Sequence, residues 1–263
     1  VPVPPMHLLC EDDSVIGTSF YVMGFVEGRI FWDPALPDLS REDRAAVYDA
    51  MNAALAALHR VDPAKVGLAD FGKPGNYFAR QLARWTEQYR ASETDVIEDM
   101  NNLIAWLERA LPPDDGLASL VHGDYRIDNM IFAADRVELL AILDWELSTT
   151  GHPFADLAYQ CMQWRLPNVG NMRGLAGIDR AATGIPTEEA YVARYAERTG
   201  HDPRAHWTFY LAFSLFRLGA ILQGVVKRAL SGNASNPERA LSMRRNVPLL
   251  AAMAKDIIEK DQT

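Results

Sequence analysis

Apolar residues recur at spacings of three and four along much of the chain, the pattern of helices with one buried face. Three such stripes occupy the first half: Val47, Met51, Leu55 and Leu58; Phe78, Leu82, Trp85 and Tyr89; and Val96, Met100, Leu103 and Leu107. Ser40 can cap the first helix, and Pro63 and Pro112 end the first and the third. The pattern therefore predicts three helices between Ser40 and Pro112.

The second half of the chain is also predicted to be mainly helical. One helix opens at His152-Pro153, a second runs from Thr187 to Gly200, and a long apolar one covers about 204–230. A single last helix is expected from Pro237 onward. The range 168–186 is rich in Gly and Asn and has no period, which predicts a long loop. The total is about seven helices.

Short β-rich runs are few. Phe20–Met23 is one, and a turn with glycines at its two ends, 24–28, follows it. The runs 129–132 and 137–143 have the length and spacing of two strands in a hairpin. The pattern therefore predicts an α+β fold, mostly helical, with an embedded β-hairpin.

Composition narrows the class of protein. The 263 residues suffice for one large domain or two small ones, and the net charge of −9 disfavours sequence-independent nucleic-acid binding. The run 207–226 could cross a bilayer by length, but Arg217 and Gln223 interrupt it, so we predict a core helix and no membrane span. Two cysteines without metal-ligand spacing and no visible secretory signal favour a cytoplasmic location.

The polar residues around the predicted hairpin suit phosphoryl transfer. Asn129 follows Asp124 of the string His122-Gly123-Asp124 by five residues, which is the spacing of a kinase catalytic loop. Asp144 follows the second strand. Asp124 would orient the attacking hydroxyl and accept its proton. Asn129 and Asp144 would hold Mg²⁺ on the phosphates of a nucleotide.

The strings HGDYRIDNMIF and LAILDWELSTTGHPFADLAYQCM resemble the aminoglycoside phosphotransferase and choline kinase-like family. They are most similar to the branch of kinase-like domains associated with acyl-CoA dehydrogenases, and the resemblance extends from about Phe20 to Arg239. It implies a protein-kinase-like fold, ATP and Mg²⁺ as cofactors, and transfer of the γ-phosphoryl group to a hydroxyl of a small molecule. For this branch it suggests a hydroxyacyl-CoA or hydroxy acid, and a functional link to an acyl-CoA dehydrogenase.

The resemblance also assigns roles to single residues. Gly24 and Val26 would be hinge residues whose backbone carbonyl and N–H meet the adenine, and Asp156 would brace the catalytic loop. Arg126 could face the transferred phosphate or pair with Asp128 or Glu146; both readings stay open.

Several neighbouring residues have weaker assignments. A scaffold role is favoured for His122 over proton transfer, Asp128 could accept hydrogen bonds behind the site or be exposed, and Glu146 could extend the metal shell or face substrate. Arg217 could bind substrate phosphates, although pairing with acidic residues is favoured. The loop 170–178 could line an acceptor pocket.

One part of the family pattern is missing. The chain has no Gly-rich loop or strand lysine ahead of the hinge, and its first lysine is Lys65. We therefore expect residues 1–30 to be a remnant of an N-lobe with the hinge, and 31–263 to be a helical C-lobe with its catalytic loop at 120–146. The start at Val1 suggests that a preceding segment has been removed, which puts nucleotide binding by this chain in doubt.

Two alternatives to a phosphotransferase stay open. The first is a non-catalytic kinase-like or acyl-CoA-binding module, which the missing lysine favours. The second is a metal-dependent hydrolase that would use His122, Asp124, Asp128 and Asp144. The acceptor, the choice between ATP and GTP, and the oligomeric state are not set by the sequence.

Overall fold

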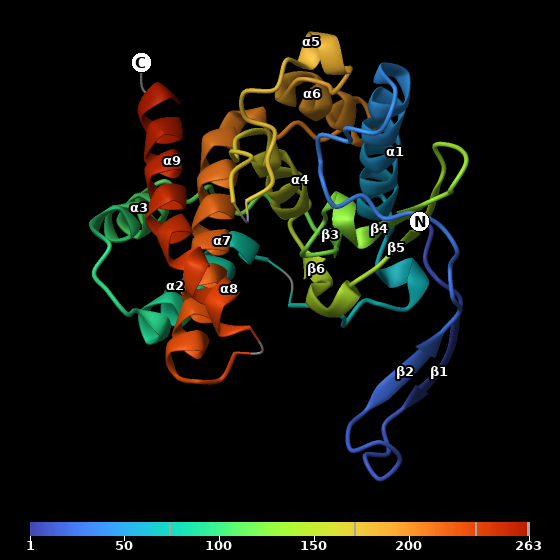
Figure 1. Cartoon of the computed structure of the whole chain (residues 1–263), viewed down its shortest axis with the longest axis horizontal. Helices are drawn as coiled ribbons and strands as arrows, with labels where there is room; N and C mark the ends of the chain where they lie inside the picture. The colour runs from blue at the N-terminus through green and yellow to red at the C-terminus, as the bar shows by residue number, and fades with distance from the viewer. Residues whose placement is uncertain (74, 171, 235, 262–263) are drawn as a thin grey trace.

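The computed structural model describes residues 1–73, 75–170, 172–234 and 236–261, and shows a helical body from which one β-hairpin projects (Figure 1). The helices of the described residues are α1 (Arg41–His59), α2 (Tyr77–Ser92), α3 (Glu98–Arg109), α4 (Phe154–Cys161), α5 (Arg180–Thr183), α6 (Glu188–Thr199), α7 (Trp207–Leu230), α8 (Pro237–Ser242) and α9 (Asn246–Asp261). The strands are β1 (Met6–Cys10), β2 (Phe20–Met23), β3 (Ser119–Val121), β4 (Met130–Phe132), β5 (Leu139–Ile142) and β6 (Thr149–Gly151). The predicted α+β class, mostly helical, is confirmed.

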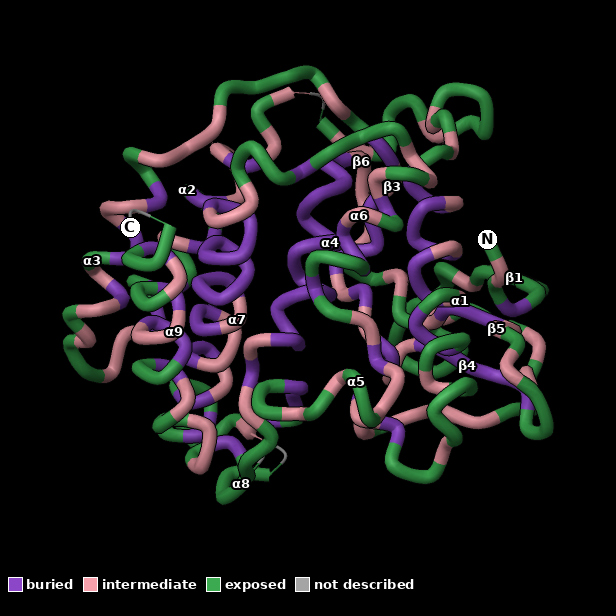
Figure 2. Tube along the Cα trace, turned by 90° about the horizontal axis from the view of Figure 1, so that it is seen from above, coloured by how far each residue is buried: buried purple, intermediate pink, exposed green. Residues whose placement is uncertain are grey.

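The long helix α7 forms the centre of the body, where it packs against α2, α4 and α9 (Figure 2). By length and composition the stretch Arg204–Leu230 could cross a membrane, but 78% of its most apolar window is buried inside the protein. A helix that is apolar on most sides is stable in water when other helices cover it. The structure thus supports the predicted core helix.

The amphipathic stripes of the first half lie where they were expected, with one exception. Val47, Met51 and Leu55 of α1 are buried, as are all four predicted residues of α2. The assignment of Val96 to the third stripe was wrong, because this side chain is 75% exposed and α3 begins at Glu98. Ile104 is buried on α3 in its place.

The prediction of one helix from Pro237 onward was also wrong. A 3₁₀ turn, Met243–Arg245, separates α8 from α9. Pro248 explains the break, because proline lacks an N–H and its ring clashes with the carbonyl four residues earlier in a helix. In the structure Pro248 lies in the first turn of α9, where neither defect matters.

The predicted loop 168–186 contains one short element. Helix α5 occupies four of its residues, and the Asp179 side chain accepts a hydrogen bond from the Ala182 N–H at the start of that helix. Residue 171 of this loop lies outside the described residues. Absence of a period therefore predicted irregular backbone correctly but could not exclude a single helical turn.

The projecting hairpin is formed by β1 and β2, which pair antiparallel. The strand Phe20–Met23 was predicted, and its partner β1 was not. Arg29 and Phe132 exchange backbone hydrogen bonds of 2.8 and 2.9 Å, which attach the segment after the hairpin to β4. Gly28 is required at this contact, because a Cβ there would lie 2.4 Å from the Phe132 carbonyl oxygen.

Candidate active site

The β4–β5 hairpin brings the two predicted metal ligands to one end of a small sheet. Met130 pairs with Ile142, and the Leu143 N–H donates to the Asn129 carbonyl at 2.8 Å. Asn129 therefore precedes one strand while Asp144 follows the other, at the same edge. The predicted hairpin and its polar end are confirmed as structure.

Asp124 and Asn129 are in direct contact. The Asn129 amide nitrogen donates to the Asp124 backbone carbonyl at 2.9 Å and to its carboxylate Oδ2 at 3.0 Å. Since both partners are acceptors, they fix which end of the amide faces Asp124. The Asn129 amide oxygen is then the end left for a cation or a donor.

His122 connects the turn that carries Asp124 to the strand end that carries Asp144. Its Nδ1 accepts the Asp124 N–H at 3.2 Å, so its Nε2 carries the proton and donates to the Leu143 carbonyl at 2.8 Å. The ring is fully buried and lies 4.7 Å from the Trp145 ring, centroid to centroid. Both nitrogens are occupied, which agrees with the scaffold role favoured from the sequence.

Asp156 on α4 holds the same turn from its buried side. Its carboxylate accepts the N–H groups of His122 at 2.6 Å and Gly123 at 2.8 Å, and His59 Nε2 lies 3.3 Å away. Burial alone would raise the pKa of Asp156, but the hydrogen bonds from the His59 side chain and from the His122 backbone N–H hold it below its ordinary value. The carboxylate is thus kept ionised beneath the turn.

Arg217 of α7 belongs to this site in a way that was not foreseen. Its Nη2 donates to the Gly123 carbonyl at 2.5 Å, and its guanidinium lies 4.9 Å from the Tyr159 ring centroid and 5.4 Å from that of Trp85. The side chain is 7% exposed. It has no acidic partner among the described residues, so the pairing favoured from the sequence is wrong, while the binding of substrate phosphates stays a prediction.

Tyr159 of α4 is a second neighbour that sequence reasoning missed. Burial raises the pKa of its hydroxyl, and the adjacent Asp124 carboxylate raises it further. The sequence signal for either residue was a polar group within a mainly apolar helix. That signal gives no indication of which loop the polar group contacts.

The remaining predicted residues have clear positions. Arg126 forms an ion pair with Asp128, with its Nε 3.0 Å from Oδ1. Of the two roles considered for Arg126, its contacts are those of pairing with Asp128. Glu146 is exposed. Asp144 has an exposed side chain and a positive φ of 65°, a left-handed conformation that Asp tolerates better than most residues.

The two residues predicted for the hinge, Gly24 and Val26, lie just beyond β2. The Gly24 N–H donates to the Pro5 carbonyl at 2.7 Å. Neither the Gly24 carbonyl nor the Val26 N–H has a hydrogen-bond partner in the described part of the chain. These two groups are therefore free to meet a ligand, and their contact with adenine stays a prediction.

The ligand set of the hydrolase alternative is not assembled. Both nitrogens of His122 are engaged, and Asp128 is paired with Arg126. Across residues 1–73, 75–170, 172–234 and 236–261, no three His, Cys, Asp or Glu side chains are close enough to hold a metal ion. A magnesium site needs fewer protein ligands, because Mg²⁺ keeps several waters and takes phosphate oxygens.

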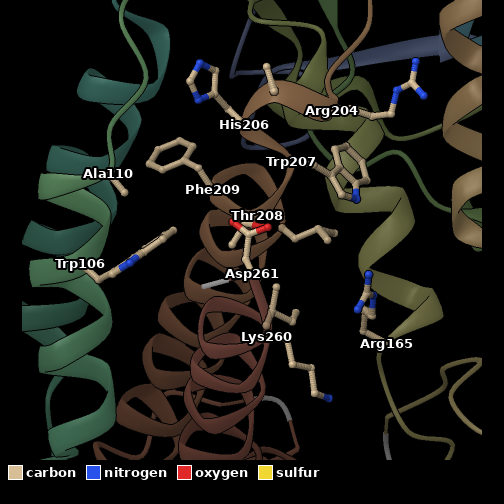
Figure 3. Close-up of a pocket in the computed structure, with 13 residues that line it drawn as sticks. Trp106, Ala110, Arg165, Arg204, His206, Trp207, Thr208, Phe209, Lys260 and Asp261 are labelled. Atoms are coloured by element: carbon tan, nitrogen blue, oxygen red, sulfur yellow. The ribbon is translucent and has the colours of Figure 1, made fainter. Parts of the chain in front are cut away.

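Among the cavities of the described residues, two are considered as an acceptor site. One, of about 320 Å³, adjoins the turn from Asp124 to Asn129, called the catalytic turn below, and includes Arg126, Asp128 and Tyr159 in its wall. A larger one, of about 510 Å³, lies at the start of α7, beside Trp106, Trp207 and Lys260 (Figure 3). None of its residues belongs to the predicted catalytic loop, and its Arg165 is paired with Glu188 at 2.6 Å. The smaller cavity is the one that adjoins the predicted catalytic residues.

Comparisons with known proteins agree with this geometry. Residues 1–205 match the model of the phosphotransferase enzyme family. The chain is 50% identical over 237 residues to mouse acyl-CoA dehydrogenase family member 10, covering 90% of this chain and 22% of that protein. It is 41% identical over 249 residues to rat family member 11, covering 94% and 32%. The chain thus spans less than a third of these curated relatives.

Solved structures add the fold. A crystal structure described as a candidate aminoglycoside phosphotransferase from Ralstonia eutropha is 49% identical, with a TM-score of 0.92 over 99% of this chain and 79% of that one. An aminoglycoside phosphotransferase bound to ADP and hygromycin B is 13% identical, with a TM-score of 0.60 over 98% and 77%, which shows the fold alone. The predicted kinase-like fold is thus confirmed, and the chain belongs to the phosphotransferase enzyme family.

Proposed function

We propose that this chain is the catalytic lobe of an ATP-dependent phosphotransferase that acts on a hydroxyl of a small molecule. The observation that carries the proposal is the hydrogen bond of 3.0 Å between the Asn129 amide and the Asp124 carboxylate. It holds a carboxylate, the proposed base, beside a carboxamide oxygen, the proposed cation ligand. A loose phosphoryl-transfer transition state needs this kind of positioning more than it needs a strong base.

In the proposed reaction the acceptor oxygen forms a bond to the γ-phosphorus of ATP. The bond from that phosphorus to the bridging oxygen breaks, and ADP leaves. The acceptor's proton passes to the Asp124 carboxylate and then to solvent. Asp124 is only half buried, so both the acceptor and solvent can reach it.

Asn129 and Asp144 are the residues that would hold Mg²⁺. Their oxygens are the hard ligands that this cation prefers, and the Asn129 amide orientation directs its oxygen away from Asp124. When bound, the ion would neutralise charge on the phosphates. His122 keeps the two ligand-bearing segments in register through its contacts with Asp124 and Leu143. We assign Arg126 to the shaping of the turn through Asp128.

We further propose that residues 1–30 are the end of an N-lobe with its hinge, and that such a lobe completes the nucleotide site. Two observations support this proposal. The Gly24 carbonyl and the Val26 N–H have no hydrogen-bond partner among the described residues, and large apolar side chains are exposed on the β1–β2 hairpin and just after it. Phe25 is 93% exposed and Leu9 is 67% exposed. Large apolar side chains in such numbers on one hairpin are typical of a surface that another element covers.

For the acceptor, we propose a hydroxyacyl-CoA or a related hydroxy acid. The support is that the curated relatives, 41 and 50% identical, are named as acyl-CoA dehydrogenase family members. A dehydrogenase acts on acyl chains, so a kinase lobe in the same protein would act on a hydroxylated acyl chain. We also propose that the protein works in the cytoplasm beside such a dehydrogenase activity.

The test is phosphate transfer followed by ³¹P NMR, with Mg-ATP and a hydroxyacyl-CoA as substrates. The proposal predicts a new phosphate monoester signal and stoichiometric ADP. The matched control is Asp124→Asn, which keeps the side-chain shape and removes the base. Nucleotide binding without transfer to any hydroxyl acceptor would instead favour the non-catalytic module.

A further inference from the structure

The 320 Å³ cavity beside the catalytic turn has walls of two kinds. Apolar side chains from α7 and from the segment that follows α4 line its interior: Met162, Leu166, Met172, Leu218 and Leu222. Arg126, Ile127 and Asp128, from the turn between Asp124 and Asn129, form another part of the wall. A ligand in this cavity would therefore lie against the segment that carries the proposed base.

Charge is distributed unevenly around the cavity. Three arginines, Arg126, Arg173 and Arg239, line the cavity together with one acidic residue, Asp128. Asp128 is already paired with Arg126. Arg173 and Arg239 are exposed, and neither guanidinium has an ion pair or hydrogen bond within the described residues. Both guanidinium groups are therefore available to an anionic ligand.

A buried polar atom marks the same cavity. Gln163 lines it and is 9% exposed, and its side-chain oxygen has no hydrogen-bond partner among the described residues. A buried acceptor without a donor is costly, so such atoms usually have a partner when the protein is at work. A ligand that carries a hydrogen-bond donor would supply it.

We propose that this cavity is the acceptor site, that its apolar walls bind an acyl chain, and that Arg173 and Arg239 bind the acceptor's anionic group. The acceptor is then an anionic amphiphile, whereas a polycation such as an aminoglycoside would meet two unpaired positive charges at the mouth. The inference rests on the proposed phosphotransfer for its link to Asp124. It goes further in naming the residues that set acceptor specificity.

The anion can come from two sources, the carboxylate of a free hydroxy acid or the phosphates of its CoA thioester. Both are recognised by guanidinium groups. The test therefore measures, by isothermal titration to the chain itself without nucleotide, the affinity of 10-hydroxydecanoate, its methyl ester and its CoA thioester. Kanamycin serves as the polycationic comparison.

The charge test compares Arg173→Ala/Arg239→Ala with Arg109→Ala/Lys227→Ala, a control that removes two exposed positive charges outside this cavity. The proposal predicts that the first pair weakens binding of the acid or the thioester at least about tenfold and leaves the methyl ester unchanged. The anionic ligand whose affinity falls identifies the anion. An equal loss for the ester, an equal loss in the control, or no loss would overturn the proposal, as would tighter binding of kanamycin than of both anions.

A second variant tests the apolar wall. Leu222→Trp fills part of the cavity and should weaken the decanoyl ligand several-fold more than the four-carbon 4-hydroxybutyrate. Equal effects on both chain lengths would contradict the placement of the chain. Because binding is measured without ATP, this inference and the phosphotransferase proposal fail separately. Charge-selective binding without phosphate transfer would contradict only the phosphotransferase proposal.

Discussion

The Nε2 of His122 lies 2.8 Å from the carbonyl oxygen of Leu143, and this contact ties the turn that carries Asp124 to the residue before Asp144. The base and the second cation ligand belong to segments separated by the whole β4–β5 hairpin. The buried imidazole thus links them directly, in addition to the Leu143 N–H bond to Asn129 and the Asn129 bonds to Asp124. Its tautomer is fixed because the Asp124 N–H occupies the other ring nitrogen.

His122→Ala should therefore lower both stability and turnover. It leaves the Leu143 carbonyl and the Asp124 N–H without their buried partner, at a cost of roughly 2 kcal/mol in the free energy of unfolding. His122→Gln, which can place an amide donor near Leu143, should recover part of the loss. Chemical unfolding measures the free energy of unfolding of each variant. Equal stability of the alanine and wild-type proteins would contradict the bridging role of His122.

Asp144 offers a backbone test as well as a ligand test. Because the φ of Asp144 is 65°, which Asn also tolerates, Asp144→Asn should keep the stability of the fold. Asp144→Ala should lower the free energy of unfolding by about 1 kcal/mol more than Asp144→Asn does. Both variants should lose Mg²⁺-dependent nucleotide binding, since a neutral side chain replaces the only carboxylate of the proposed pair. Thermal unfolding and nucleotide titration separate the two effects. Full nucleotide binding by Asp144→Asn would remove this residue from the site.

Asp156 predicts a pH dependence of stability. Its pKa in the folded protein is lowered from 3.8, so its contribution is complete above about pH 4 and is lost as the pH falls through the folded value. Asp156→Asn should destabilise the protein by about 3 kcal/mol at neutral pH, because it breaks a buried charged network. The difference from wild type should shrink below pH 4. Urea unfolding at several pH values tests it, and a constant difference would contradict the assignment.

Arg217 should act on turnover without touching the acceptor. Arg217→Met keeps much of the apolar volume but leaves the Gly123 carbonyl without its donor, so the turn can shift. We expect kcat to fall about tenfold or more with little change in the acceptor KM. Arg217→Lys should restore only part of the lost kcat, because an ammonium lacks the planar face with which the guanidinium contacts the rings of Trp85 and Tyr159. A change confined to KM would instead place Arg217 at the acceptor.

The local parts of this site could be predicted from the sequence, and the distant parts could not. The Asp124 to Asn129 spacing, the hairpin after it and the scaffold position of His122 depend on residues close together in the chain. Arg217 and Tyr159 reach the same turn from helices far along the chain, and helical periodicity does not say which loop a helix faces.

Other differences have equally physical causes. The break between α8 and α9 was visible in Pro248, but the apolar pattern continued across it and the prediction followed the pattern. Strand β3 is only three residues long and pairs with β6, so neither has a recognisable alternation of its own. Val96 continued an apolar stripe by spacing alone and lies outside the helix that the stripe predicts.

The central claim is that Asp124, Asn129 and Asp144 form a nucleotide-dependent phosphotransfer site. Its most direct test is titration of Mg-ATP into this chain and into a form extended at its N-terminus by a kinase N-lobe, each beside Asp144→Asn. The account predicts binding by the extended form at least, abolished in the variant. No binding by either form, or binding that Asp144→Asn leaves intact, would contradict it.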